Sequence, residues 1–221
     1  QGRLSGQPDL TLPVHDLALF VAAALLLNLT PGPDMLFVAG TAASRGRRAG
    51  LLAALGVGAG CLFHTVLAAV GLSALLAASD LAFNAVKWAG AAYLVWTGLA
   101  MLRARRADAD VSSARTVHGG NPFWQGALTN ALNPKVALFF LAFLPQFVDT
   151  GAPGQAWALV VLGTLFNLGG TGVNLVVAWV ASRAAAGLAS ADGAGRFGPW
   201  LQRAAGAMFV GLGLKLALSS R

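Results

Sequence analysis

The sequence has few residues able to carry charge or redox chemistry. It contains no glutamate, eight aspartates, one tyrosine and a single cysteine, and 10% of its 221 residues are charged. One thiol, Cys61, builds neither a disulfide framework nor a paired-cysteine redox centre. Any carboxylate chemistry inside an apolar segment therefore falls to aspartate, and only Asp34 lies deep in one.

What the chain does contain is apolar. Hydrophobic residues make up 57% of it and its mean hydropathy is +0.68, a composition typical of membrane proteins. Stretches such as LLAALGVGAGCLF do not alternate polar and apolar residues, which argues against a membrane β-barrel. A transmembrane helix needs about 20 mostly apolar residues. The sequence thus predicts an all-α integral membrane protein with six transmembrane helices, at 16–42, 49–78, 82–102, 122–148, 155–183 and 199–219.

The chain has a net charge of +7, and most of its arginines lie in alternate loops between the predicted helices. By the positive-inside rule these loops are cytoplasmic, so both termini are expected to face outward. The distribution of the arginines indicates that they set the membrane topology and also contact lipid headgroups, and it argues against nucleic-acid binding. The residues concerned are Arg45, Arg47 and Arg48, then Arg103, Arg105, Arg106 and Arg115, and finally Arg183 and Arg196.

Two halves of the chain resemble each other. KWAGAAYLVW, from Lys87, is similar to RAAGAMFVGL, from Arg203, and NLTP at 28–31 is matched by NALNP at 130–134. We predict a duplicated three-helix unit, and because three is odd the second copy must be inverted, as in many secondary transporters. After an N-terminal tail at 1–15, the transporter domain at 16–219 then comprises repeat one at 16–102, a cytoplasmic linker at 103–121 and repeat two at 122–219.

Each polar break is predicted to split a helix, the first and the fourth of the six. Thr30 and Asn133 are expected to be N-caps, with Pro31 and Pro134 at the first helical positions. Backbone groups freed at a break inside the membrane need partners from protein or from water in a cavity. A helix that starts at such a break points its partial positive end toward that cavity. The plainer alternative is two ordinary proline kinks, with the nearby Lys135 extending to the membrane interface.

Asp34 and Lys135 fall in the first turns of the two new half-helices. Leaving either charge unpaired at membrane depth costs about 3 kcal/mol on insertion scales. We therefore expect the two side chains to face each other, directly or across a bound substrate.

Two further groups of polar residues have two interpretations each. Asn167 and Asn174 share one face of the fifth helix with two threonines, and this face either lines a pathway or hydrogen-bonds to other helices. His64 either relays protons, because imidazole titrates near neutral pH, or packs as a hydrogen-bonded residue. Gly56 and Gly60 form a GxxxG spacing that predicts close helix packing.

Together these residues resemble the LysE/RhtB family of bacterial amino-acid exporters. The resemblance rests on LTPGPDM at 29–35, GRRAGLLAALGVGAG at 46–60, the histidine in FHTVLAAVGL, KWAGAAYLVWTGLAMLR at 87–103 and NPKVALFFLAFLPQFV at 133–148. It implies a secondary transporter of the bacterial inner membrane that exports amino acids or close derivatives by proton antiport with alternating access. It implies no enzyme activity and no cofactor, and members carry either Asn or Asp after the PGP motif.

An amino acid is a zwitterion, so its carboxylate is expected near Lys135 and the half-helix N-termini, and its ammonium near Asp34 and the carbonyls freed at Asn28 and Asn130. Protons are expected on Asp34 and His64. A homodimer, a divalent-metal exporter of related architecture and an integral membrane enzyme stay open as alternatives. The candidate substrate-binding residues are Asn28, Thr30, Pro31, Gly32, Asp34, Asn130, Asn133, Pro134, Lys135, Asn167 and Asn174.

Overall fold

The computed structural model describes residues 12–72, 120–149 and 151–186, and the single positions 88, 91, 92, 95, 96, 99, 102, 207, 210, 211, 214, 217 and 218. Most of the predicted spans at 82–102 and 199–219 lies outside the described residues. So do most of the linker and tail and the sequence match between Lys87 and Arg203.

The described part of the chain is helical. The described residues form no β-strand; Val14 and Val148 form one isolated β-bridge. The prediction of an all-α protein is confirmed for these residues. The elements are α1 (Leu17–Leu29), α2 (Pro33–Arg45), α3 (Arg47–Leu67), the π-helical turn η1 (Ala68–Leu72), α6 (Pro122–Ala131), α7 (Pro134–Leu138), the π-helical turn η3 (Phe139–Phe143), the 3₁₀ turn η4 (Leu144–Phe147) and α8 (Gln155–Ala185).

Two described helices are long and apolar enough to cross a membrane: Arg47–Gly71, with 25 residues, and Gln155–Ala185, with 31. The pairs α1/α2 and α6/α7 each reach that length only when their two members are taken together, and each pair is bent by 46° at a short break. Between α2 and α3 the chain turns at Gly46, whose φ of 83° is one that glycine adopts without strain.

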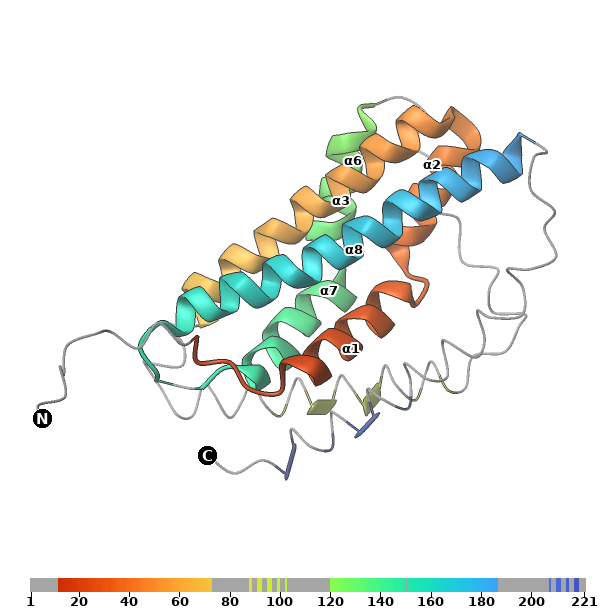
Figure 1. The fold of residues 1–221 in the computed structure, drawn as a ribbon. Helices are drawn as coiled ribbons and strands as arrows, with labels where there is room; N and C mark the ends of the chain where they lie inside the picture. Colours follow the sequence, from red (N-terminus) through yellow and green to blue (C-terminus); the bar gives the residue numbers. More distant parts are fainter. Residues whose placement is uncertain are drawn as a thin grey trace, which may run out of the picture.

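The long helices α3 and α8 lie side by side and run in opposite directions (Figure 1). Their contacts progress accordingly: Gly50 on α3 faces Ala178, and Gly163 near the start of α8 faces Thr65. Glycine lets the two backbones approach closely at these points, because a Cβ on Gly163 would lie 2.8 Å from the Thr65 side chain.

The two bent pairs also lie antiparallel to each other. Phe20 near the start of α1 meets Phe147 after α7, with ring centroids 5.4 Å apart. Arg45 at the end of α2 donates to the carbonyl oxygen of Gly120, just before α6, at 2.9 Å. The break after α1 and the break after α6 therefore lie beside each other in the middle of the two pairs.

Helix α3 packs closely on α6 through the predicted glycine spacing. A Cβ on Gly56 would clash with the backbone of Phe123, and one on Gly60 would clash with the carbonyl of Ala127. The prediction that this spacing serves close packing is confirmed. The result is that α6, with Asn130 in its last turn, is held directly against α3.

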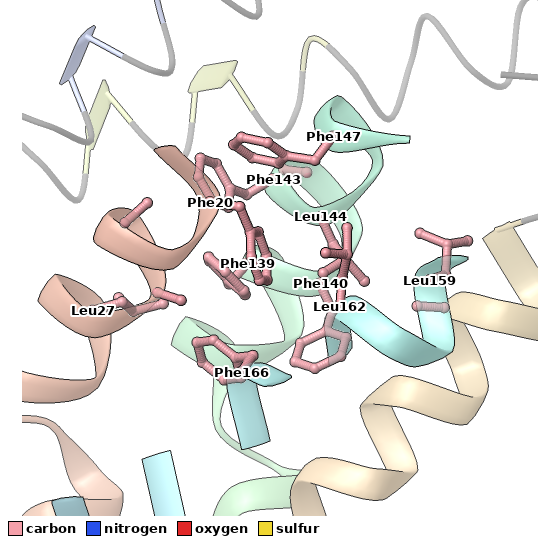
Figure 2. Close-up of a cluster of buried hydrophobic side chains, with 14 of the residues drawn as sticks. Phe20, Leu27, Phe139, Phe140, Phe143, Leu144, Phe147, Leu159, Leu162 and Phe166 are labelled. Atoms are coloured by element: carbon pink, nitrogen blue, oxygen red, sulfur yellow. The ribbon is translucent and has the colours of Figure 1, made fainter. Parts of the chain in front are cut away.

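An aromatic core fills the space on one side of the breaks. Phe20 of α1, four phenylalanines of the α7–η4 segment and Phe166 of α8 pack together with aliphatic side chains (Figure 2). Phe139 and Phe166 stack with centroids 4.4 Å apart. Such packing fixes α1, the α7–η4 segment and α8 relative to one another, and so fixes the two breaks that they border.

Candidate functional site

The first break follows Leu29. Thr30 is the C-cap of α1, with ψ at 122°, and its hydroxyl donates to the carbonyl of Leu26. The prediction that Thr30 is an N-cap is wrong. Gly32 is extended and is the N-cap of α2, and Pro33 takes the first helical position. A residue before proline avoids the helical region, and since Gly32 precedes Pro33 the new helix cannot start at Pro31.

The second break follows the prediction. Asn133 is the N-cap of α7, and its side-chain oxygen accepts the backbone N–H of Lys135 at 3.0 Å. Pro134 occupies the first helical position, where its missing N–H removes no helix hydrogen bond. Asn133 is almost fully buried, with 2% of its surface exposed, so this cap lies inside the protein.

The Asp34 carboxylate joins the two breaks. It lies in the first turn of α2, where the helix dipole favours a negative charge. Its Oδ2 accepts one hydrogen bond from the Asn130 amide at 2.8 Å and another from the Asn133 amide at 2.9 Å. Both donors come from the second break, so the carboxylate is bound by the opposite half of the described fold. Its other oxygen, Oδ1, is buried and has no hydrogen-bond partner among the described residues.

The Lys135 ammonium makes the reciprocal contact. Its Nζ donates to the carbonyl oxygens of Leu27 and Thr30, both at 2.9 Å. Among the described residues no ion pair joins it directly to Asp34, so the direct form of the predicted pairing is wrong. The reason is the end of α1: its last carbonyls carry the negative end of the helix dipole, which attracts the cation, and that of Leu27 accepts the Thr30 N–H as well, at 3.2 Å.

Of the two carbonyls expected to be free for a substrate ammonium, at Asn28 and Asn130, that of Asn130 is in use. The Asn130 carbonyl accepts from the backbone N–H of Asn133 at 2.9 Å and lies 3.0 Å from Nε2 of His64. At the first break, Lys135 takes the carbonyls of Leu27 and Thr30. In this conformation several of the freed carbonyls at both breaks are therefore bound by protein groups.

Two small cavities adjoin Asp34, each of about 30 Å³. A water molecule needs about 10–15 Å³ of such space, so each cavity has room for about two waters. The first is bordered by Lys135 and the second by α3, and Asp34 borders both. Predicted residues on the first lining are Asn28, Thr30, Gly32, Asp34, Asn133, Lys135 and Asn174, and on the second Asn28, Asp34, Asn130, Asn167 and Asn174.

Three predicted residues lie off both linings, namely Pro31, Pro134 and His64. Sequence reasoning missed the apolar and small part of the walls. These side chains carry no pattern that separates them from dozens of similar residues elsewhere in the chain. The missed residues are Leu27, Met35, Val57, Cys61, Val136, Phe166 and Gly170. In the described part of the chain no three His, Cys, Asp or Glu side chains gather as metal ligands would.

The family model described as LysE type translocator matches residues 25–220 of the chain. The chain belongs to this family. The resemblance seen in the sequence is thereby confirmed. The match includes both breaks and every residue that lines the two cavities.

Individual relatives of this translocator agree with the assignment. An uncharacterized membrane protein of Pseudomonas aeruginosa is 34% identical over 95% of this chain and 98% of its own. A homoserine/homoserine lactone efflux protein of Salmonella typhimurium is 35% identical over 64% of this chain and 69% of its own. A leucine efflux protein of Klebsiella pneumoniae is 35% identical over 65% and 69%. No solved structure matches the chain. Family and relatives point to a membrane transport protein.

Proposed function

We propose that this translocator is a secondary active transporter that exports amino acids or close derivatives across the bacterial inner membrane in exchange for protons. Relatives named for the efflux of leucine and of homoserine or its lactone support this substrate class. The observation that carries the proposal is the pair of charges at the two breaks. Asp34 and Lys135 come from different halves of the chain and border one cavity, which suits the two charges of a zwitterion.

For the architecture we infer six transmembrane helices in two inverted repeats, at 16–102 and 122–219, with the first and fourth helices broken. Three observations support this: the antiparallel course of α3 and α8, the antiparallel course of the two bent pairs, and their equal bend of 46°. Breaks that meet between inverted repeats are where secondary transporters bind substrate.

We infer that both termini face the periplasm. Arg45 ends α2, Arg47 begins α3 and Arg183 lies in the last turn of α8, and the contact of Gly50 with Ala178 brings these three helix ends together. The opposite end holds Asp16 and Asp149. Because basic residues favour the cytoplasmic side, this separation of charge supports the orientation.

The conformation described here is closed around the site. Each cavity takes about two waters, whereas leucine has nine non-hydrogen atoms, so a substrate requires the halves to separate. The aromatic core includes Phe20 and Phe147 (Figure 2). It therefore borders the end of α1 that begins at Asp16. We propose that this core opens toward the periplasm and the α2/α6 end opens toward the cytoplasm in alternation.

Each end of the substrate would displace a contact that the protein makes with itself. Its carboxylate would compete with the carbonyls of Leu27 and Thr30 for Lys135. Because these contacts join the two breaks, their loss supports a coupling between substrate binding and the separation of the two halves. Its ammonium would compete with a proton for Asp34. One proton moved inward through about 150 mV is worth roughly 3.5 kcal/mol, which supports a gradient of about 300-fold.

His64 is the second group that we propose for proton movement. The Asn130 carbonyl only accepts, so Nε2 of His64 must be the nitrogen that carries hydrogen. The neutral ring then keeps a lone pair on Nδ1 that can take a proton. His64 is 5% exposed and contacts Asn130, whose amide binds Asp34, so the imidazole is one residue removed from the carboxylate.

The test uses proteoliposomes that contain the full chain, labelled amino acids inside and an inward proton gradient outside. We expect one or more amino acids to leave faster when the gradient is imposed. Asp34→Asn should abolish this acceleration, since amide cannot take up the proton. Asp149→Asn makes the same change in an exposed carboxylate far from both cavities and should keep it. If no amino acid is exchanged, the proposed function is wrong. If Asp34→Asn retains the response, proton coupling resides elsewhere.

A further inference from the structure

The second cavity has an unusual excess of hydrogen-bond acceptors. Three of the residues on its lining, Asp34, Asn130 and Asn174, each have a buried Oδ1 without a hydrogen-bond partner in the described part of the chain. Leaving a buried polar atom unpaired costs about 1–3 kcal/mol. Three such atoms around one small space indicate a missing donor and not a chance defect.

The amide orientations follow from their other contacts. The Asn130 amide nitrogen donates to a carboxylate and the Asn174 amide nitrogen donates to the carbonyl of Gly170 at 3.1 Å. Both of those partners are acceptors, so the nitrogen must be the atom that faces them and the oxygen must be the atom left over. The cavity is thus bordered by three acceptors in any consistent assignment.

We propose that this cavity is a cage for a primary ammonium group, and that Asn130 and Asn174 select substrates whose nitrogen carries three hydrogens. The inference rests on the proposed function and specifies its substrate class. A primary ammonium has three donors and no acceptor, which matches three acceptors one for one, and its positive charge is balanced by Asp34. A single water molecule has two donors and leaves one oxygen unpaired, and two waters, for which the cavity has room, carry no charge to balance Asp34.

The donors within the protein do not meet this need. Lys135 borders the first cavity and not the second, and its Nζ already donates to two carbonyls. The Thr171 hydroxyl donates to Asn167 at 3.1 Å. The Asn28 and Asn167 amides also border the cavity, and the Asn28 nitrogen donates to the carbonyl of Phe166 at 3.1 Å. No described side chain donates to the three oxygens, which are therefore left for the ligand.

A substituent on that nitrogen removes one of its three donors. The cavity is also bordered by Val57, Cys61, Val136 and Phe166, and its 30 Å³ has room for about two water-sized groups. An N-methyl group would replace one hydrogen bond by a contact with this wall and leave one acceptor unpaired. One hydrogen bond to a charged group corresponds to roughly tenfold or more in affinity.

The experiment measures exchange of labelled L-leucine and L-homoserine in proteoliposomes, with unlabelled parent, N-methyl and N,N-dimethyl derivatives as competitors. We expect the N-methyl compounds to compete at least about tenfold less well than the parents, and the dimethyl compounds less well again. Asn174→Leu and Asn174→Ala each remove one acceptor. Both should weaken the parent about tenfold and leave the N-methyl derivative unchanged, so the ratio between them should approach one. Thr164→Val, on the same helix and off both linings, should keep the wild-type ratio.

A general defect in folding or transport would lower both competitors together and leave the ratio intact, and that outcome would overturn the role of Asn174. Equal competition by parent and N-methyl compounds in the wild type would refute the proposed ammonium cage and would not contradict the proposed amino-acid export. Exchange that requires sodium and ignores N-methylation would assign the acceptors to a metal cation instead. Failure of every amino acid to exchange would refute the proposed function together with the cage.

Discussion

Asn133 performs two separable tasks, and its replacement by alanine tests how firmly the two halves of the fold are joined. Its side-chain oxygen caps α7 through the N–H of Lys135, and its amide donates to the Asp34 carboxylate at 2.9 Å. Asn121 caps α6 in the same way, accepting the N–H of Phe123 at 3.0 Å ahead of a proline, but it has no carboxylate partner among the described residues and is exposed.

The matched pair isolates the hydrogen bond to Asp34. Losing an N-cap costs about 1 kcal/mol, and this is all that Asn121→Ala should cost. Asn133→Ala loses the same cap and, in addition, a hydrogen bond to a charged group worth about 1.5–3 kcal/mol. Asn133→Ser keeps a capping oxygen and is too short to reach Asp34, so it should lose mainly the second amount.

The assay is thermal unfolding of the purified chain in detergent. For 150–250 residues, 1 kcal/mol shifts Tm by roughly 2–4 °C. Asn133→Ala should therefore unfold about 3–12 °C below Asn121→Ala, and Asn133→Ser, which keeps the cap, about 2–4 °C above Asn133→Ala. Equal Tm values for the two alanine variants would refute the reasoning, because they would mean that the contact between Asn133 and Asp34 adds nothing to the stability of the fold.

Three further outcomes are expected. Gly60→Ala should destabilise the fold by about 1–3 kcal/mol, because the new methyl would meet the backbone of α6; Gly40→Ala, with open space around it, should be neutral or slightly stabilising in the same unfolding assay. His64→Gln keeps a donor for the Asn130 carbonyl and removes the ring nitrogen that we propose takes up the proton, so exchange at one pH should persist while its pH dependence flattens; an unchanged pH profile would leave His64 a packing residue. Lys135→Met should weaken competition by leucine more than competition by leucinamide, which has no carboxylate, and an equal loss for both would place the carboxylate elsewhere.

The helices and their ends were largely predictable from local sequence. Runs of Leu, Ala and Val of membrane length predicted α3 and α8, and Asn133 before Pro134 predicted both the cap and the start of α7. These features depend on side chains within a few residues of one another, where capping and proline chemistry act. The single local error, at Thr30, came from weighing Pro31 without the effect of Pro33 on Gly32.

Contacts between distant segments decided the site itself. The sequence marked Asp34 and Lys135 as charges in need of partners, and within the protein it offered each only the other, with a bound substrate or a proton as the alternative. The tertiary structure instead sets Asp34 against two amides and Lys135 against the open end of α1. Backbone carbonyls at a helix end are present in every helix and leave no mark in the sequence, so only the antiparallel meeting of the two breaks revealed them as the partners of a lysine. The same holds for the cage: composition determined that the chain is apolar, helical and poor in charge, whereas the direction in which the Asn130 amide points depends on Asp34, 96 residues away, and only the packing of the helices brings Asn130, Asn174 and Asp34 to one cavity.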